Sequence, residues 1–248
     1  MWIPRWIGEP YAMLYEEFKL ETFRLKDALR VIPTNNVNMV KVILSRLHKE
    51  ALLMIFERSK PRLYRLIDPE TFIAFASGKI KKIKIPQEKY LKLIYDSYKV
   101  LKNNIALTSL AVYGSVARGT ASATSDIDLF IVSNDFKGTL GERIEFLIRI
   151  VKKEIIDSEI KFLNRSGIYT FLSFYPLRKD EVERTPLLML DMVDDAKIVY
   201  DEGNFLEKQL LKLKLKLVEL GAKKIYIGKD KWYWDLCPKY KPLEVVFI

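Results

Sequence analysis

The sequence predicts an α+β protein with a small helical N-terminal domain, a larger domain around a mixed sheet, and a C-terminal helix followed by short strands. Three observations indicate this fold class. Apolar residues recur at helical spacing in three stretches before residue 50, strand-like runs alternate with amphipathic stretches after it, and a Lys-rich helical stretch closes the pattern. We therefore expect four segments, at 1–68, 69–86, 87–205 and 206–248.

The first 50 residues predict three helices, because apolar side chains recur every three or four positions. The first covers 10–18 and starts at Pro10, and the second covers 22–32 and is entered through Thr22. Pro33 ends the second helix. The third has an apolar face made of Val37, Val40, Ile43, Leu44 and Leu47.

Two β-like runs follow, at 52–56 and 63–67, and the polar tip 57–62 joins them as in a hairpin. Three helices and a hairpin in this order resemble a winged helix-turn-helix DNA-binding domain. The resemblance implies that the third helix enters the major groove and that the basic tip contacts phosphate. The residues expected to bind nucleic acid are Asn36, Asn38, Lys41, Arg46, Arg58, Lys60 and Arg62. The alternative is a helical bundle whose hairpin supports the next domain or pairs with another subunit.

Residues 70–85 contain a Lys-rich patch at 79–84, which we interpret as a connector or an edge strand. Beyond Pro86 the pattern alternates between helix and strand. Helices are expected at 86–104, 139–156, 186–193 and 206–220. Strands are expected at 105–113, 126–132, 168–175 and 196–200, with strand-like runs at 224–227 and 244–248.

The net charge of +10 is unevenly distributed along the chain. Residues 1–68, 69–104 and 206–248 carry +4, +5 and +5, whereas residues 105–205 carry −4. An acidic middle between basic flanks indicates a cation-binding centre with phosphate-attracting surroundings. Abundant Lys and Glu with scarce Gln, Cys and His are also typical of heat-adapted proteins, so adaptation accounts for part of the basicity.

The composition excludes several classes of site. The single cysteine, Cys237, excludes an internal disulfide and a multi-cysteine zinc site, and the single histidine, His48, argues against a histidine-based triad. No apolar run approaches the ~18 residues of a membrane-spanning helix. Pro4, Arg5 and Glu9 interrupt the N-terminus where a signal peptide is apolar, so we expect a cytoplasmic protein with no membrane partner.

The stretch YGSVARGTASATSDIDLFIVS, at 113–133, combines two features that suit phosphate chemistry. Gly114 follows an expected strand and permits a tight turn that approaches a ligand closely. Ser115 lies where a short helix can begin, so its hydroxyl and the nearby amides form an anion cradle, with Arg118 on the same side. Asp126 and Asp128 face the same way in the next strand, and their repulsion predicts a divalent cation, Mg²⁺ or Mn²⁺.

A phosphate cradle beside a carboxylate pair is typical of metal-assisted phosphoryl transfer. The segment resembles the signature of the nucleotidyltransferase superfamily, which has the DNA polymerase beta-like fold. That signature is an apolar strand, Gly-Ser, an Arg-Gly loop, and then Ser-Asp-apolar-Asp-apolar. The residues that match it are Gly114, Ser115, Arg118, Gly119, Ser125, Asp126, Asp128 and Leu129.

The resemblance implies a nucleotide site and a reaction. Asp126 and Asp128 would hold two Mg²⁺ ions, and Ser115 with the Gly114–Ser115 amides would grip the β- and γ-phosphates of a nucleoside triphosphate. Arg118 would neutralise triphosphate charge. An acceptor hydroxyl would attack the α-phosphorus, and pyrophosphate would leave. Gly114, Ser115, Arg118 and Ser125 are therefore the expected nucleotide-binding residues.

The family usually supplies a third carboxylate from a later strand, but the expected strand at 168–175 contains no Asp or Glu. Three explanations are open: another acid such as Glu159 or Asp235, weak catalysis with two carboxylates, or an inactive domain. Two functions follow. The first is a Mg²⁺-dependent nucleotidyltransferase tethered to DNA by residues 1–68. The second is a catalytically weak or inactive DNA-binding regulator of the antitoxin type, which would bind a partner protein.

Overall fold

The computed structural model describes residues 3–228, 231–236 and 238 of the 248-residue chain. The chain separates into two compact units, Met1–Tyr95 and Asp96–Ile248, each with a core of its own. The four-segment division expected from the sequence stays a prediction. In the described part of the chain, no helix is long and apolar enough to cross a membrane.

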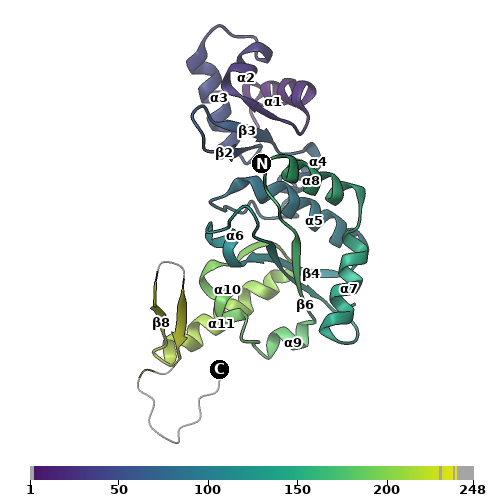
Figure 1. The fold of residues 1–248 in the computed structure, drawn as a ribbon, viewed down its shortest axis with the longest axis vertical. Coiled ribbons are helices and arrows are strands. Elements are labelled where there is room, and N and C mark those ends of the chain that lie inside the picture. Colours follow the sequence, from purple (N-terminus) through teal and green to yellow (C-terminus); the bar gives the residue numbers. More distant parts are fainter. Residues whose placement is uncertain (1–2, 229–230, 237, 239–248) are drawn as a thin grey trace, which may run out of the picture. The chain divides into compact units, whose positions relative to one another are not determined.

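The first unit packs helices against a three-stranded antiparallel sheet with the strand order β1-β3-β2 (Figure 1). Its core joins the inner faces of the helices to the strands, through residues such as Ile7, Phe23, Leu47 and Leu66. The elements are α1 (Arg5–Phe18), β1 (Thr22–Arg24), α2 (Leu25–Val31), α3 (Val37–Lys49), β2 (Leu53–Glu57), β3 (Leu63–Leu66), α4 (Pro69–Ala76) and η1 (Glu88–Tyr90), and α5 (Leu91–Asn104) continues into the second unit.

The predicted third helix and the predicted hairpin are confirmed, at α3 and at β2–β3. Three other predictions were wrong. The first helix does not start at Pro10: α1 begins at Arg5, contains Pro10 and buries Ile7 in the core. The helix expected from Thr22 begins at Leu25, because residues 22–24 form an edge strand that pairs with β3 and buries Phe23. The edge-strand alternative for 79–84 fails because these residues form no strand; they bury Ile80 and Ile83 without a ladder.

The second unit is built on a four-stranded mixed sheet with the order β6-β5-β4-β7. β5 runs parallel to β6, and β4 runs antiparallel to both β5 and β7. The elements are β4 (Leu107–Tyr113), α6 (Gly114–Arg118), β5 (Ile127–Ser133), α7 (Leu140–Val151), α8 (Glu154–Arg165), β6 (Leu172–Leu177), α9 (Lys179–Glu183), α10 (Met189–Asp195), β7 (Lys197–Asp201), η2 (Glu202–Asn204), α11 (Phe205–Glu219), β8 (Lys223–Tyr226) and β9 (Trp232–Asp235).

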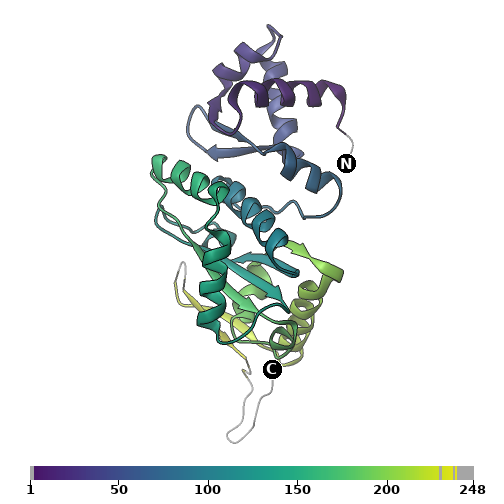
Figure 2. The ribbon, with the colours of Figure 1, turned by 90° about the vertical axis from the view of Figure 1, so that its right-hand side faces the viewer.

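Both faces of this sheet are covered by helices, as Figure 2 shows from the side. Successive residues of β5, Leu129, Phe130 and Ile131, point to opposite faces, and all three are fully buried. Phe130 and Val132 pack with α10 and α11 in one core. The sheet therefore holds β4 and β5 rigidly, and the loops at their ends are positioned by buried strands.

Two predicted elements of this unit need correction. The single helix expected at 139–156 is two helices, α7 and α8, separated at Lys152 and Lys153. In one continuous helix, Glu154 and Ser158 would lie on the same face as the buried Leu147. The break changes which face of the helix is buried, so that α8 buries Phe162 instead. The strand expected at 168–175 lies at 172–177, and it contains Pro176 because β6 is an edge strand.

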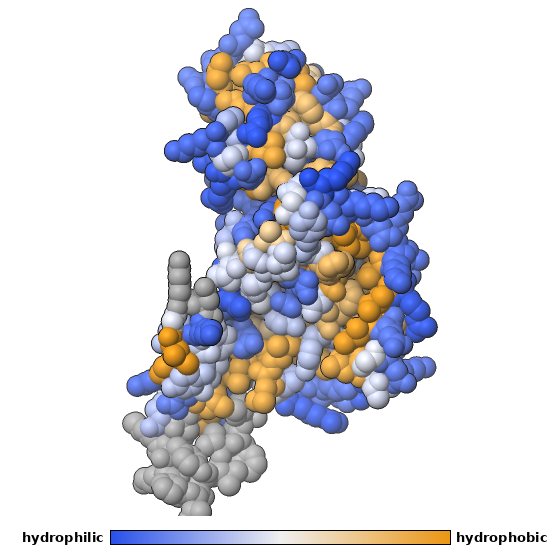
Figure 3. Space-filling model, in the orientation of Figure 1, coloured by the Kyte–Doolittle hydropathy of each residue, from blue (hydrophilic) through white to orange (hydrophobic). Residues whose placement is uncertain are grey.

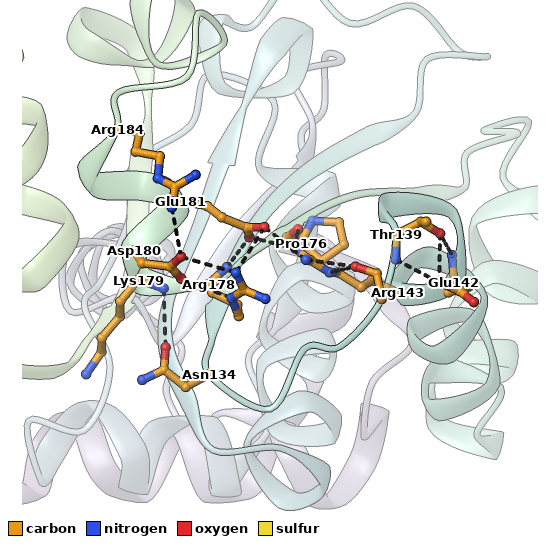
Figure 4. A network of polar contacts seen from close by, with 11 residues as sticks. Asn134, Thr139, Glu142, Arg143, Pro176, Arg178, Lys179, Asp180, Glu181 and Arg184 are labelled. Atoms are coloured by element: carbon orange, nitrogen blue, oxygen red, sulfur yellow. Dashed lines mark hydrogen bonds and ion pairs between the residues drawn. The ribbon is translucent and has the colours of Figure 1, made fainter.

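A polar network anchors the end of β6 to α7 and α9 (Figure 4). The buried guanidinium of Arg143 donates to both carboxylate oxygens of Glu181, at 2.6 and 2.9 Å, and to the carbonyl of Gly138, at 2.9 Å. Glu181 also accepts from the backbone amide of Arg178, at 2.8 Å. This bidentate pair fixes the register between three elements that precede α10.

The predicted strand-like run at 224–227 is confirmed by β8, which pairs antiparallel with β9. The hairpin contacts α10 through two polar groups: Trp234 Nε1 donates to the carbonyl of Leu190 at 3.1 Å, and Lys224 Nζ lies 3.4 Å from Asp195. The run expected at 244–248 lies outside the described residues.

Candidate active site

The turn after β4 places Ser115 at the carboxyl end of an interior strand of the sheet. Gly114 begins α6 with a φ of +70°, a conformation that L side chains rarely adopt. The short helix ends at Gly119, whose φ is +81°, and the amide of Thr120 closes the turn on the carbonyl of Ser115 at 2.9 Å. Ser115 therefore lies in a tightly closed turn directly after the buried strand β4.

The same turn lies against the acidic pair on β5. A Cβ on Gly114 would overlap Oδ2 of Asp128 and would lie 3.1 Å from its Cγ. The neighbouring residue, Tyr113, is the cross-strand partner of Asp128 in the β4–β5 ladder. The backbone of the Gly-Ser turn and the carboxylate of Asp128 are therefore in direct contact, and glycine is the residue that allows this approach.

The two acids have different surroundings. Asp126 precedes β5 and is exposed, whereas Asp128 is half-buried within it. Burial raises the pKa of Asp128 above its ordinary value; a hydrogen bond from Ser173 lowers it, the charge of Asp126 raises it again, and Arg118 lowers it. Asp128 is therefore an incompletely solvated carboxylate beside a second acid, which is the condition that a cation relieves.

Ser173 lies on β6, the strand from which a third carboxylate was expected. It is the register partner of Asp128 in the parallel β5–β6 pair. Its hydroxyl hydrogen-bonds the Asp128 carboxylate, so this neighbour supplies a donor instead of a negative charge. The strand in which the sequence has no acid therefore runs directly beside the acidic pair.

Asp191 is a charged group near the site that the sequence did not single out. It lies on α10, which packs against α6 and β4. Burial raises its pKa, and the charges of Arg118 and Lys224 partly offset that effect. The pKa of Tyr113 is raised by burial and then by Asp128, Tyr175 and Asp191. Arg118 and Tyr113 therefore both interact with the acid on β5 and the acid on α10.

The two other acids considered from the sequence lie elsewhere. Glu159 is buried within α8, and Asp235 is the register partner of Lys223 in the β8–β9 hairpin. Neither is among the charges that act on Asp128. Across the described residues, no group of three or more His, Cys, Asp or Glu side chains could by itself hold a metal ion.

Two carboxylates still fit a magnesium site in which substrate oxygens supply further ligands. Mg²⁺ is usually held through one or two carboxylates, with substrate phosphates and water completing its octahedral shell. Asp126 and Asp128 offer oxygen donors only, and the raised pKa of Asp128 marks the charge that such an ion would neutralise. The donor set therefore suits Mg²⁺ or Mn²⁺ together with a bound polyphosphate.

Ser125, expected to bind nucleotide, takes part in the loop between α6 and β5. Its hydroxyl accepts from the amide of Ser122 at 2.8 Å, and its carbonyl accepts from the Thr170 hydroxyl at 2.8 Å. These bonds connect the loop to the segment before β6 and so fix the approach to Asp126.

The seven residues expected to bind nucleic acid fall on α3 and on the β2–β3 hairpin of the first unit. Asn36 caps α3, accepting from the amides of Asn38 and Met39 at 3.0 and 3.2 Å. Arg46 pairs with Glu50 at 2.9 Å, and Arg58 lies 3.5 Å from Glu88. The exposed members of the set are Asn36, Asn38, Lys41, Arg58, Lys60 and Arg62.

Comparisons with known proteins found matches to the segment that contains this site. Residues 97–188, which contain the Gly-Ser turn and both acids, match the family described as "Nucleotidyltransferase domain". A curated relative from Methanocaldococcus jannaschii, named "Putative protein adenylyltransferase MJ1305", is 28% identical over 125 residues, which is 50% of this chain and 78% of the relative.

Two solved structures are similar at lower identity. One, titled "Crystal structure of the toxin-antitoxin with AMP-PNP", is 18% identical with a TM-score of 0.29, covering 50% of this chain and 89% of that chain. The other, titled "Crystal structure the toxin-antitoxin MntA-HepT", is 15% identical with a TM-score of 0.28, covering 52% and 91%. The family match and the curated relative support the nucleotidyltransferase superfamily for this part of the chain.

Proposed function

We propose that the second unit transfers a nucleoside monophosphate from a nucleoside triphosphate to a hydroxyl acceptor, with Mg²⁺ or Mn²⁺ as cofactor. The observation that carries the proposal is the contact between Gly114 and the Asp128 carboxylate. It joins a turn suited to phosphate with a carboxylate pair suited to a divalent cation. Either feature alone is common, but together they can position the phosphates beside a metal ion, which phosphoryl transfer needs.

The chain's own groups have separate roles in this mechanism. Asp126 and Asp128 hold the cation, and the Ser115 hydroxyl donates to a phosphate oxygen of the bound triphosphate. The Arg118 guanidinium offsets phosphate charge from the end of α6, where it already interacts with Asp128. Mg²⁺, when bound, supplies charge neutralisation at the phosphates and lowers the pKa of the acceptor hydroxyl.

The bonds exchanged follow from the substrate. The acceptor oxygen forms a bond to the α-phosphorus, the bond between that phosphorus and the bridging oxygen of the β-phosphate breaks, and pyrophosphate leaves. The rigid strands β4 and β5 hold the turn and the acid pair in fixed positions, so much of the rate enhancement comes from positioning and electrostatics.

The test is incubation of the protein with each of four NTPs carrying labelled α-phosphate, in the presence of Mg²⁺. Label should appear on the protein itself, on added RNA or DNA, or on a small acceptor, with release of pyrophosphate. Asp126→Asn and Asp128→Asn should each reduce transfer on the order of 100-fold or more. Absence of NTP binding and of transfer with both Mg²⁺ and Mn²⁺ would refute the proposal.

We infer for the first unit a winged-helix DNA-binding role, so that the transferase is tethered to nucleic acid. Its element order, α1-β1-α2-α3-β2-β3 with an antiparallel sheet, supports this proposal because it resembles the order of a winged helix-turn-helix domain. Lys41 on α3 and Arg62 on the hairpin are exposed cations. Lys41→Ala and Arg62→Ala should weaken duplex binding across sequences, each reducing the salt slope by about 1. Duplex binding that is absent or independent of salt would exclude this role.

A second candidate function is favoured by Ser173, a neutral residue beside Asp128 on the strand that was expected to carry a third acid. Here the second unit binds a nucleotide with little or no turnover and regulates a partner protein, as an antitoxin does. NTP binding with Mg²⁺, without transfer to any acceptor, would favour this function. Transfer that is lost in Asp126→Asn would exclude it.

A further inference from the structure

The first unit contains a cavity that the transferase site does not use and that shares Arg58 with the residues expected to bind nucleic acid. Its volume is about 640 Å³, within the range of about 300–1,000 Å³ typical of small-molecule sites. It lies between the C-terminal half of α3, the start of β2, the hairpin and residues 82–91. Figure 3 shows hydrophilic side chains interspersed with apolar patches on the visible face of this unit.

The lining of the cavity is strongly basic. Its cations are Lys49, Arg58, Lys82 and Lys84, and His48 adds an imidazole. Among the described lining residues, Glu88 is the acid that faces these groups. Permanent positive charges therefore exceed negative charges by three, which favours an anionic ligand.

Glu88 organises the basic groups rather than cancelling them. Its carboxylate accepts from the amide of Ile55 at 2.7 Å and from His48 Nε2 at 2.9 Å, and it lies 3.5 Å from Arg58 Nη2. One carboxylate thus connects α3, β2 and the hairpin, and it fixes the orientation of two cavity-lining side chains. Lys82 is likewise held, because its Nζ donates to the carbonyl of Glu50 at 2.9 Å.

The remaining lining residues are apolar except for Ser45. Leu53, Ile83, Ile85 and Leu91 line the cavity and belong to the buried residues of the unit. Lys49 and Lys84, in contrast, are exposed and available to a ligand from solvent. A ligand that satisfies both parts needs an apolar ring for the walls and a charged group for the cations. A duplex backbone offers the charge, but its bases are stacked and cannot enter a cavity.

We propose that this cavity binds a phosphorylated small molecule of mononucleotide size. The ring lies against Leu53 and Ile85, and the phosphate lies on Lys49, Arg58 and Lys84. Binding does not need a divalent cation, because the protein supplies the positive charge. The proposal is independent of the transferase reaction, which uses other residues in the other unit.

The test uses the full chain carrying both Asp126→Asn and Asp128→Asn, so that the transferase site cannot bind metal. Isothermal titration calorimetry with AMP and ATP in EDTA should give one site. Lys49→Ala and Lys84→Ala, each added to that background, should weaken it at least tenfold. Lys81→Ala is the matched control, since Lys81 is exposed in the same segment but does not line the cavity, and it should bind normally. Saturation-transfer NMR should show contact with the ring protons.

Three outcomes would overturn the proposal. The first is the absence of binding by AMP and ATP in EDTA. The second is binding of inorganic phosphate as tight as binding of AMP, because the ring would then contribute nothing. The third is binding of duplex DNA that depends on Lys49 and Lys84 when no mononucleotide binds, which would assign these lysines to a nucleic-acid surface. Thermal melts of each variant establish that the fold is intact.

Discussion

Asp128 on β5 and Ser173 on β6 are register partners, and the serine hydroxyl donates a hydrogen bond to the carboxylate. A neutral donor on the neighbouring strand thus faces the half-buried acid. The bond lowers the pKa of Asp128 against the effect of burial, so the serine keeps the carboxylate more readily ionised. Ser173 therefore adjusts the pKa of Asp128 but adds no negative charge to Asp126 and Asp128.

Ser173→Asp should supply that charge. Without metal, a third carboxylate beside Asp128 adds like-charge repulsion, and the thermal midpoint should fall. With Mn²⁺, the added carboxylate should tighten metal binding about tenfold or more, because a further negative charge attracts a divalent cation strongly at short range. Calorimetric titration with Mn²⁺ measures this, and Ser173→Asn is the neutral control. Equal Mn²⁺ affinity in the two variants would contradict the placement of the metal beside Asp128.

Gly114→Ala should abolish transfer while a comparable change elsewhere does not. The added methyl group overlaps Oδ2 of Asp128, so either the turn or the carboxylate must move. A displacement of about 1 Å in such a site can cost about 100-fold in rate. Gly221→Ala is the control, because Gly221 has a similar φ of +67° and no atom within 4 Å of the added Cβ. Both variants bear the backbone strain, so a difference in activity between them reports the contact with Asp128.

The acidic pair and its turn were predictable because the interactions are local. Gly114, Ser115, Asp126 and Asp128 lie within 15 residues, and buried strands on both sides leave little freedom in how the segment folds. The helix α4 was predictable in the same way but was not expected. Its start carries a local signal, since Asp68 caps it by accepting from the amide of Thr71 at 2.9 Å and Pro69 follows.

Other features depend on contacts that are distant in sequence. Asp191 reaches the surroundings of Arg118 because α10 packs against α6, and no spacing rule links residues 118 and 191. At the break between α7 and α8 the buried face of the helix changes, and the nearly continuous apolar periodicity of the sequence gives no sign of this change. From the sequence, Pro176 was expected to end the strand, but because β6 is an edge strand, Pro176 remains part of the β5–β6 pairing.

Asp128→Asn should stabilise the metal-free protein at neutral pH. Burial raises the pKa of Asp128, so ionising it is harder in the folded state than in the unfolded state. The resulting penalty is absent below the ordinary aspartate pKa of about 3.9 and grows as pH rises through the raised value. The variant should therefore melt higher at pH 7, by no more than about 4 °C, and should match the wild type near pH 3. Thermal melts in EDTA across this range check it, and a gain that persists at pH 3 would contradict the assignment to ionisation.

Arg143→Ala should destabilise the second unit more than the loss of an exposed arginine does. Arg143 is 6% exposed and holds Glu181 through two hydrogen bonds, so among the described residues its removal leaves the carboxylate with the Arg178 amide and side chain as partners. We expect a loss of about 2–4 kcal/mol, slightly below the range of about 3–5 kcal/mol for broken buried pairs, because Glu181 is 25% exposed. Arg184→Ala is the control, since Arg184 is 78% exposed in its pair with Asp180 and its loss should cost less than ~1 kcal/mol.

The contribution of the Arg143–Glu181 pair should depend on pH. Arg143 lowers the pKa of Glu181, so this contribution to stability is complete above the ordinary glutamate pKa of about 4.3 and is lost as pH falls through the lowered value. Denaturant titrations at pH 7 and pH 3 should show the difference between wild type and variant narrowing in acid, and a constant difference would mean that packing, not charge, holds α9 to α7.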